Sequence, residues 1–394
     1  MSWPMVKLKD CCKVVGGATP KRNIPEYWDT QDVPWVTPKD ISKLSNKVLD
    51  DAPEYISQLG FDKCATYLLP KGTVLLTSRA PIGNVAIAGR DMCTNQGFKS
   101  LVPLDRVDST YLYYCMLFHS PMLEVLGNGA TFKEVSKKIV EEFEIPLPPL
   151  EEQKRIAAIL DKADAIRQKR KQAIELADEF LRSVFLDMFG DPVSNPKGLP
   201  QVKLTDLADV VTGFAFKSAE YVDDDKASVR LCRGANTLPG YFDWKDTAYW
   251  NSGKLKGIEH YKIDAGDVIL AMDRPWISSG LKVCVFPENE RDTYLVQRVA
   301  RIRPNTSLYI DYLYASILSK AFERHCCPTE TTVPHISPVE LKNYSLLMPN
   351  EEQLEKYHNT VATVRKSKLA MESSWLKSNQ FFDSLSQKAF SGQL

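Results

Sequence analysis

The sequence predicts a mixed α/β (α+β) protein with two similar strand-rich domains and two long helices, which pair as an antiparallel coiled coil. Three observations carry this prediction. The chain of 394 residues repeats itself at an offset of about 200 residues. Each copy ends in about 40 residues with helical periodicity, and a block of about 145 residues with short β-branched runs precedes each helical stretch. Such a chain is expected to have a pseudo-twofold internal repeat.

The repeat defines the domain organisation. The triplet Glu-Glu-Gln at residues 151–153 returns at residues 351–353, at the start of each helical stretch. Further matched pairs are Val6 with Val202, Asp10 with Asp206, Gly17 with Gly213, Gly72 with Gly266, Gln96 with Gln297, Tyr111 with Tyr312, Phe180 with Phe381 and Phe189 with Phe390. A period this long indicates duplicated domains, because solenoid repeats are much shorter. We predict a first domain at residues 1–145, a helix at 146–190, a second domain at 191–347 and a second helix at 348–394.

Both helical stretches carry an apolar seam at alternating three- and four-residue steps, as in a coiled coil. The seam residues are Ile156, Leu160, Ala163, Ile174, Ala177, Leu181, Val184 and Met188 in the first, and Leu354, Tyr357, Val361, Val364, Met371, Trp375, Phe382, Leu385 and Ala389 in the second. Polar members at Arg167, Arg170 and Lys368 are expected to fix the register at some cost in stability. At 1.5 Å per residue, each helix would be roughly 60 Å long.

The strand-rich blocks supply the candidate binding residues. Strands are predicted at residues 73–77, 85–88, 268–270 and 282–286, and short helices at 111–118 and 309–318. Loops between them carry Arg, Lys, Asn and Gln, the side chains that read base edges in the DNA major groove. The candidate DNA-binding residues are Thr19, Lys21, Arg22, Lys39, Arg79, Asn84, Asn95, Gln96, Lys99, Lys133, Phe216, Lys217, Arg230, Arg233, Asn236, Arg274, Trp276, Gln297, Arg298, Thr332 and His335. For any single one of them, a solvated loop position remains the alternative.

The charge balance restricts how such a protein could hold DNA. The chain has 50 basic and 50 acidic residues, so its net charge is zero. A protein that gripped phosphates alone would normally have a basic excess. Either the charges are sorted by face, or partner subunits neutralise the phosphates.

Composition and motifs exclude several other classes. Nine cysteines without a CxxC spacing, no leader-like segment and no long apolar run predict a reduced, cytoplasmic protein without a membrane span. The chain has no phosphate-binding GxxxxGK[ST] loop, no GxSxG or HExxH motif, and no Asn-Pro-Pro-aromatic motif of adenine methylation. His325 stands beside two cysteines without a second ligand cluster. We therefore predict no catalytic residue, no metal site and no cofactor on this chain.

Several segments resemble the specificity subunits of type I restriction–modification systems. They are residues 144–156 (EIPLPPLEEQKRI), residues 180–192 (FLRSVFLDMFGDP), residues 391–394 (SGQL) and the opening GGATP at residues 16–20. The resemblance covers the whole chain in the order domain, helix, domain, helix. The second domain departs from the pattern, with Gly213-Phe214-Ala215-Phe216 in place of the GATP opening.

The resemblance implies a function. In this family, each target recognition domain reads one half of a bipartite DNA target, and the paired helices set the spacer between the halves. Two methyltransferase subunits dock on the specificity subunit, and two motor-nuclease (restriction) subunits can join them. S-adenosylmethionine, ATP and Mg²⁺ would belong to these partners. The different opening of the second domain implies an asymmetric target. The open alternatives are the specificity subunit of a type IIG-like system and a non-catalytic coiled-coil scaffold with two binding blocks.

Overall fold

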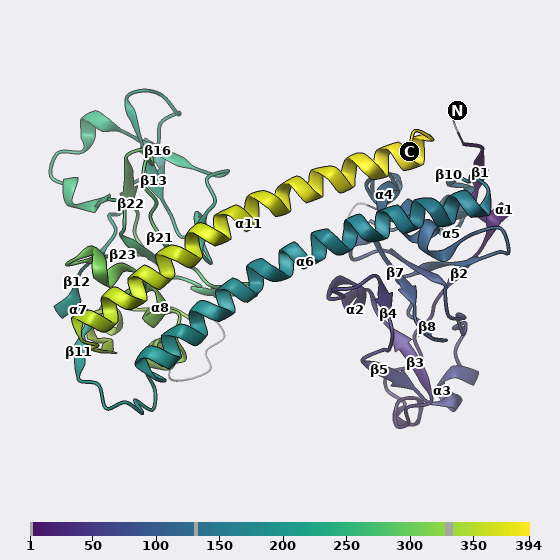
Figure 1. Cartoon of the computed structure of the whole chain (residues 1–394), viewed down its shortest axis with the longest axis horizontal. Coiled ribbons are helices and arrows are strands. Elements are labelled where there is room, and N and C mark those ends of the chain that lie inside the picture. The colour runs from purple at the N-terminus through teal and green to yellow at the C-terminus, as the bar shows by residue number, and fades with distance from the viewer. Residues whose placement is uncertain (1–2, 130–132, 328–333) are drawn as a thin grey trace. The chain divides into compact units, whose positions relative to one another are not determined.

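The computed structural model describes residues 3–129, 133–327 and 334–394. The chain forms two compact units: unit 1 comprises Met1–Gln172 and Glu372–Leu394, and unit 2 comprises Ala173–Met371. Each unit combines one strand-rich domain with one part of each long helix (Figure 1). We call residues 1–145 domain 1 and residues 191–347 domain 2. The units therefore divide the chain through the middle of both helices, whereas the predicted boundaries lie at the helix ends.

Domain 1 is built on a mixed sheet with the strand order β2-β9-β6-β7-β4 and on a smaller sheet with the order β5-β3-β8. A separate antiparallel pair, β1 with β10, joins the two ends of the domain. The elements are β1 (Met5–Lys7), α1 (Leu8–Cys11), β2 (Cys12–Gly16), β3 (Val33–Val36), α2 (Pro38–Ser42), β4 (Val48–Leu49), β5 (Glu54–Ile56), α3 (Gln58–Asp62), β6 (Val74–Ser78), β7 (Ile82–Ala88), β8 (Cys93–Thr94), β9 (Lys99–Pro103), α4 (Ser109–Leu126), α5 (Lys137–Glu142) and β10 (Glu144–Pro146).

Domain 2 repeats this plan with different details. Its main sheet has the order β12-β23-β18-β21, its second sheet has the order β16-β13-β22-β17, and β11 pairs with β24 as β1 pairs with β10. The elements are β11 (Gln201–Lys203), α7 (Leu204–Leu207), β12 (Ala208–Thr212), β13 (Ser228–Cys232), β14 (Thr237–Leu238), β15 (Tyr241–Phe242), β16 (Ala248–Asn251), β17 (Lys262–Ile263), β18 (Val268–Ala271), β19 (Trp276–Ile277), β20 (Gly280–Leu281), β21 (Val283–Val285), β22 (Thr293–Leu295), β23 (Val299–Pro304), α8 (Ile310–Ile317), α9 (Lys320–Cys326), α10 (Pro338–Asn343) and β24 (Ser345–Leu347).

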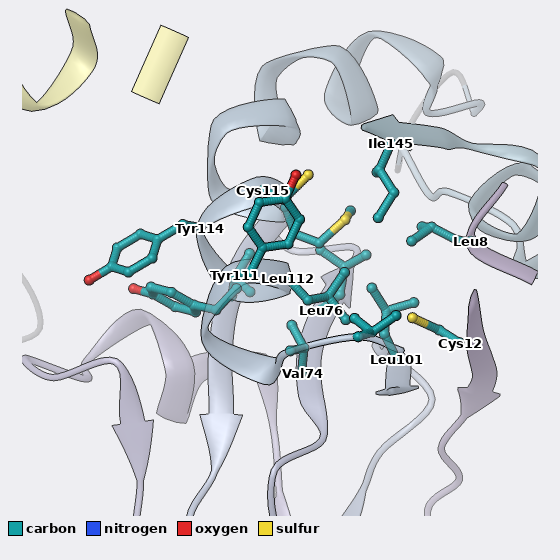
Figure 2. Close-up of a cluster of buried hydrophobic side chains, with 14 of the residues drawn as sticks. Leu8, Cys12, Val74, Leu76, Leu101, Tyr111, Leu112, Tyr114, Cys115 and Ile145 are labelled. Atoms are coloured by element: carbon teal, nitrogen blue, oxygen red, sulfur yellow. The ribbon is translucent and has the colours of Figure 1, made fainter. Parts of the chain in front are cut away.

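The core of domain 1 lies between helix α4 and the main sheet. Figure 2 shows Tyr111, Leu112 and Cys115 of α4 beside Val74 and Leu76 of β6. All five side chains are at most 2% exposed. Burying an aliphatic or aromatic side chain stabilises a fold by about 1.5 to 3 kcal/mol. This core holds the ends of β6 and β9 rigidly, which matters because the loops beyond those ends form the candidate site.

The two long helices are α6 (Leu150–Phe189) and α11 (Glu351–Ser391), each uninterrupted in Figure 1. Helix α6 begins directly after two prolines and ends directly before a glycine with φ of +80°, residues that favour helix boundaries. Every residue of the predicted seams is buried or partly buried. The periodicity of the sequence therefore identified the faces by which these helices pack.

The helices pair antiparallel, as the contacts within each unit show. In unit 1, the guanidinium of Arg155, near the start of α6, donates to the carbonyl of Leu394, just beyond the end of α11. Arg170 Nη1 donates to the carbonyl of Ser374 at 2.8 Å. In unit 2, Lys368 Nζ lies 2.6 Å from Asp178 Oδ1. Two of the predicted polar seam residues, Arg170 and Lys368, thus bridge the helices and constrain their register.

Each domain also packs against the C-terminal end of one long helix: domain 1 against the end of α11, and domain 2 against the end of α6. In unit 1, Phe390 of α11 packs edge-on against Tyr111 of domain 1, with ring centroids 5.6 Å apart. In unit 2, Phe189 of α6 packs against Tyr312 of domain 2 at 5.1 Å. Phe189 and Phe390 occupy equivalent positions in the repeat, and so do the two tyrosines. This shared attachment means that the duplication includes the packing as well as the sequence.

The repeated Glu-Glu-Gln triplet has a different structural role in each copy. Gln153 is completely buried, and its amide nitrogen donates to the carbonyls of Pro148 at 2.8 Å and Arg106 at 3.0 Å. Gln353 instead caps α11: its side chain accepts from the Asn350 amide at 3.1 Å, while Asn350 Oδ1 accepts from the Gln353 amide at 2.8 Å. The first triplet ties α6 to domain 1, and the second only starts its helix.

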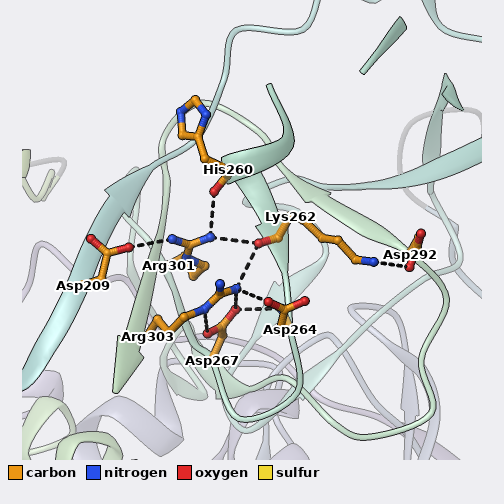
Figure 3. A network of polar contacts seen from close by, with 8 residues as sticks. All are labelled: Asp209, His260, Lys262, Asp264, Asp267, Asp292, Arg301 and Arg303. Carbon is orange, nitrogen blue, oxygen red and sulfur yellow. Dashed lines mark hydrogen bonds and ion pairs between the residues drawn. The ribbon is translucent and has the colours of Figure 1, made fainter. Parts of the chain in front are cut away.

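A charged network joins the main sheet and the second sheet of domain 2 (Figure 3). Arg301 on β23 is 3% exposed and donates to Asp209 Oδ2 and to two backbone carbonyls. Arg303 donates to both carboxylate oxygens of Asp267, at 2.8 and 2.7 Å, and Asp267 is 1% exposed. These hydrogen bonds raise the pKa of the Arg303 guanidinium, with its burial acting in the opposite direction.

Replacing Arg303 should therefore destabilise domain 2. Arg303→Ala removes both side-chain donors from the buried Asp267 carboxylate, and we expect a loss of about 2 to 3 kcal/mol in the free energy of unfolding. The loss stays below that of a wholly buried pair because the Arg303 side chain is 35% exposed and water can replace it. Lys262→Ala is the matched control, since its partner Asp292 is 60% exposed. Equal losses in the two variants, measured by denaturant unfolding, would contradict this account.

Within the described ranges, no helix combines the length and the apolar character needed to span a bilayer.

Candidate nucleic-acid interface

The candidate site in domain 1 forms where four segments meet at one end of the main sheet. The amide of Ser78, at the end of β6, donates to the carbonyl of Gly97 at 2.7 Å, in the loop before β9. The carbonyl of Ser78 in turn accepts from the amide of Val135 at 3.0 Å, in the segment before α5. The loop after β2 joins through the amide of Ala18, which donates to the carbonyl of Thr94 at 3.0 Å. Backbone hydrogen bonds thus fix all four segments.

Domain 2 builds the same arrangement with the same hydrogen bonds. Met272, just beyond β18, donates to the carbonyl of Arg298 at 2.9 Å and accepts from the amide of Ile336 at 2.8 Å. The amide of Phe214 donates to the carbonyl of Leu295 at 2.9 Å. Residue equivalence between the domains follows from these bonds. Arg79 corresponds to Asp273, Glu134 to His335, Gln96 to Gln297, Gly97 to Arg298 and Lys99 to Ala300.

A glycine in each domain allows the loops to meet. A Cβ atom on Gly17 would lie 2.1 Å from the carbonyl oxygen of Thr94, and one on Gly213 would lie 2.2 Å from that of Val296. Any side chain at either position would force the loop after β2 or β12 away from the loop before β9 or β23. These glycines are matched in the repeat, so the close approach is a shared feature of the two sites.

In domain 1, the four segments bring together cationic, acidic and amide side chains. Glu134 Oε1 lies 3.1 Å from Lys99 Nζ, and the second oxygen of Glu134 lies 3.9 Å from Arg79 Nη1. The Arg79 side chain is 37% exposed, whereas Lys99 is only 14% exposed. Gln96 is exposed, and its carbonyl oxygen accepts from the hydroxyl of Thr19. The cluster exposes the amide of Gln96, which the hydroxyl of Thr19 orients. It also exposes the guanidinium of Arg79, which makes no hydrogen bond to Glu134.

Domain 2 carries the same kinds of groups in a different arrangement. Asp273 Oδ2 lies 3.0 Å from Arg298 Nη1, and Asp273 Oδ1 lies 3.9 Å from His335 Nδ1. The Arg298 side chain is 68% exposed, and Gln297 beside it is also exposed. A pocket opens at this place, lined by Thr212, Gly213, Met272, Asp273, Gln297, Arg298, His335 and Pro338. Nearby, burial lowers the pKa of the Lys282 ammonium, an effect that Asp273 partly offsets.

The other candidates in domain 1 lie around this cluster or on the smaller sheet. Lys21, Lys39 and Lys133 are exposed. Arg22 pairs with Glu54, and its guanidinium lies 3.8 Å from the ring centroid of Trp28. The remaining two make hydrogen bonds within the domain: Asn84 Nδ2 donates to Ser42 Oγ at 2.9 Å, and Asn95 Oδ1 accepts from the Gly97 amide at 2.8 Å.

Three candidates in domain 2 are buried, which corrects their assignment from the sequence. Phe216 is 5% exposed, in an apolar cluster with Trp250. Arg230 is 8% exposed, where it pairs with Glu290 and stacks on Trp244. Asn236 is 1% exposed, and its amide nitrogen donates to two backbone carbonyls. These side chains support the fold, and we leave them out of the candidate interface.

The last candidates of domain 2 differ in accessibility. Lys217 and Arg274 are exposed, and Arg274 has a positive φ of 45°. Arg233 is partly buried and pairs with Asp246 at 3.1 Å. Trp276 is partly buried against the core of domain 2. Thr332 lies outside the described residues.

The sequence reading missed the two carboxylates of the clusters, Glu134 and Asp273. No acidic residue is among the candidates from the sequence, because a carboxylate repels phosphates. The matched glycines at 72 and 266 place Asp273 opposite Arg79, and the matched glutamines at 96 and 297 place Glu134 opposite His335.

Comparison with known proteins agrees with this architecture. The family model for the type I restriction modification DNA specificity domain matches residues 2–176. The type I restriction enzyme MjaIX specificity subunit of Methanocaldococcus jannaschii is 28% identical over 409 residues, covering 100% of this chain and 93% of the relative. The EcoR124I/EcoR124II specificity subunit of Escherichia coli is 27% identical over 162 residues, covering 39% of each chain.

Two solved structures share the fold. One, from a study of complex assembly and conformational transition in a type I restriction–modification system, covers 100% of this chain and 98% of its own, with a TM-score of 0.58 and 19% identity. The other, the type I system S subunit from M. genitalium, covers 99% and 96%, with a TM-score of 0.53 and 14% identity. The chain therefore carries a type I restriction modification DNA specificity domain at residues 2–176, and over its whole length it is similar to the specificity subunit of such a system.

Proposed function

We propose that each domain reads one half of a bipartite, asymmetric DNA target. The observation that carries this proposal is the equivalence of the two loop clusters. Both are assembled by the same backbone hydrogen bonds around a matched glycine, and both expose a matched glutamine. Their charged side chains nevertheless differ at almost every equivalent position. Two similar scaffolds with different exposed chemistry suit the recognition of two different base sequences.

The exposed side chains have the chemistry that base reading requires. An amide can pair with N6 and N7 of adenine, and a guanidinium can pair with O6 and N7 of guanine. Gln96 and Gln297 supply the amides, and Arg79 and Arg298 supply the guanidinium groups. Neighbouring lysines such as Lys21 and Lys133 are exposed and suited to phosphate contacts, which position a protein on DNA without reading its sequence.

The long helices have two roles in this proposal: they set the spacer between the half-sites and bind methyltransferase subunits. Phe180 of α6 is 52% exposed and Phe381 of α11 is 60% exposed. The two phenylalanines are matched in the repeat, so the helices offer equivalent apolar contacts. A single exposed apolar side chain is normal on a protein surface, so the matched position of the two phenylalanines supports the proposal. Two copies of one partner, a methyltransferase subunit on each surface, fit this duplication.

The partners would supply what this chain lacks. The net charge of zero leaves much of the phosphate neutralisation to other subunits. We assign the methyl donor S-adenosylmethionine to the two methyltransferase subunits, and ATP with Mg²⁺ to two restriction subunits that join them. Action in the cytoplasm fits the nine free cysteines, since disulfides are rare in reducing compartments.

A selection experiment tests the two-part target. The complex of this chain with its methyltransferase subunit would be used to select DNA from a random duplex library, at a stated salt concentration because phosphate contacts are strongly salt-dependent. We expect enriched sequences with two specified blocks separated by a gap of constant length and random sequence. Enrichment of one continuous block, or of no sequence, would contradict the proposal.

A further inference from the structure

Both clusters contain a glutamine, an arginine and a carboxylate, but the carboxylate lies on a different segment in each domain. In domain 1, the residue after β6 is Arg79, and the segment before α5 carries the carboxylate, Glu134. In domain 2, the equivalent positions carry the carboxylate Asp273 and the imidazole of His335. The N–O separation is 3.9 Å in both pairs. The position of the pair is therefore kept, while the carboxylate and its nitrogen-bearing partner exchange segments.

The reversal changes which loop supplies a guanidinium beside the matched glutamine. In domain 1, Arg79 comes from the loop after β6, and the loop before β9 carries Gln96 followed by Gly97. In domain 2, the loop before β23 carries Gln297 followed directly by Arg298. Each domain thus has one exposed glutamine and one exposed arginine with a carboxylate next to it, but the arginine enters from a different segment.

We propose that Arg79 and Arg298 are the guanine-reading side chains of the two half-sites, while Gln96 and Gln297 read adenine. This inference rests on the proposed function of the two domains. Because the arginine approaches from a different loop in each domain, the guanine lies at a different place relative to the adenine in the two half-sites. Glu134 and Asp273 are positioning residues, which orient the guanidinium groups and contact no base.

The geometry around Arg79 favours this role over a structural one. Glu134 has its hydrogen bond from Lys99, a side chain that is only 14% exposed. At 3.9 Å, Arg79 is attracted to Glu134 without donating a hydrogen bond to it. A half-exposed pair at this distance contributes little to stability, about 0 to 1 kcal/mol. Among the residues that the structure describes, Arg79 donates no hydrogen bond, so its five guanidinium donors remain available to a base at small cost.

The backbone at Arg298 provides an independent observation. Its φ of +64° lies in the left-handed region, which costs a non-glycine residue about 1 kcal/mol or more. Gly97, the equivalent residue in domain 1, does not adopt this conformation. The Arg298 carbonyl accepts from Met272, so the strained conformation is held by the sheet end. The exposed ion pair that Arg298 makes with Asp273 contributes only about 0 to 1 kcal/mol, which does not exceed that cost. Strain of this kind is concentrated at binding and catalytic sites.

Base-pair preferences of arginine variants test the inference. The complex with the methyltransferase subunit would be tested on DNA libraries in which each half-site is randomised. We expect Arg79→Ala to lower the preference for one G·C pair by about 5- to 150-fold in one half-site and to leave the other half-site unchanged. Arg298→Ala should do the same in the other half-site only. Each variant is thus the internal control for the other.

Further variants separate reading from general effects. Arg90→Ala is the matched control: Arg90 is a half-exposed arginine of domain 1, 3.2 Å from Asp51, and it follows the opposite end of β7 from the cluster. It should leave both half-sites unchanged. Glu134→Gln and Asp273→Asn should each weaken the preference at the same base pair as the neighbouring arginine variant, by a smaller factor. A weakened preference at any other base pair would contradict a positioning role.

The possible outcomes are distinct. The inference would be overturned if Arg79→Ala and Arg298→Ala both left the base preferences of the two half-sites unchanged. It would also be overturned if both variants weakened the preference in the same half-site. If an alanine variant selects no DNA, the lysine variants decide, because lysine keeps the charge and loses the bidentate fork. Arg79→Lys or Arg298→Lys should then relax the same G·C pair, and unchanged preference would overturn the inference. A wild-type complex that selects no two-part sequence would instead refute the proposed function.

Discussion

Inserting one heptad into each long helix is expected to lengthen the recognised spacer by about three base pairs. Seven residues add about 10 Å to a helix, and one base pair of DNA rises about 3.4 Å. The insertions belong after Gln172 in α6 and after Met371 in α11. Each insertion falls between the contact of Arg170 with Ser374 in unit 1 and the contact of Asp178 with Lys368 in unit 2, so both pairs of contacts are kept. A heptad turns the helix face by only about 20°, so the seam stays aligned.

The measurement is the gap length of the DNA that the complex methylates or selects. A seven-residue insertion after Gly198, in the linker between α6 and β11, is the control, because a side chain there would meet no atom within 4 Å. This control lengthens the chain without lengthening the helices and should leave the gap unchanged. If the helix variant were folded and active but kept the original gap, the helices would not determine the spacer.

The adjacent residues Phe381 and Phe382 should have opposite roles. Phe382 is 5% exposed and packs on Tyr114, with ring centroids 6.0 Å apart, and the guanidinium of Arg167 lies 4.4 Å from its ring centroid. Phe382→Ala would leave a cavity where α11 meets α6 and domain 1. We expect it to lower the free energy of unfolding by about 3 to 5 kcal/mol. Phe381 is 60% exposed, and Phe381→Ala should change stability by less than about 0.5 kcal/mol.

Alanine variants of the two exposed phenylalanines, Phe381 and Phe180, test partner binding separately from folding. In the proposed function, Phe381 belongs to an apolar surface that binds a methyltransferase subunit, as Phe180 does on the other helix. Phe381→Ala and Phe180→Ala should therefore weaken methyltransferase binding while the free chain keeps its unfolding curve. Calorimetric titration of each variant with the methyltransferase subunit would measure this effect. Wild-type affinity in both variants would exclude these phenylalanines from the docking surface.

The sequence predicted the long helices and the main strands well, for a simple physical reason. A seam at three- and four-residue steps and short β-branched runs are local patterns, and local patterns determine which face of an element is buried. The predicted seam does not include Phe185 and Phe189. Both pack against Tyr312 of domain 2, in addition to the opposite helix. Their partner lies more than 120 residues away in the chain, and no periodicity indicates such a contact.

The candidate site was harder to predict than the fold. Arg230 and Asn236 have the residue types of a DNA-binding loop, but Arg230 is buried against Glu290, 60 residues away in the sequence. Burial of a charged group depends on such distant partners and cannot be read from residue type. The repeat identified Gln96 and Gln297 because both scaffold and side chain are duplicated. Arg79 and Asp273 differ in charge, so residue type does not mark them as a matched pair, and the backbone hydrogen bonds of Ser78 and Met272 establish their equivalence.

Methylation of genomic DNA tests the central claim most directly. Cells expressing the methyltransferase subunit would be sequenced by a single-molecule method that detects methylated adenine, with and without this chain. The account predicts a gapped, asymmetric two-part motif that is methylated only when the chain is present. A methylation pattern unchanged by the chain, although the chain is expressed and bound to the methyltransferase subunit, would contradict it.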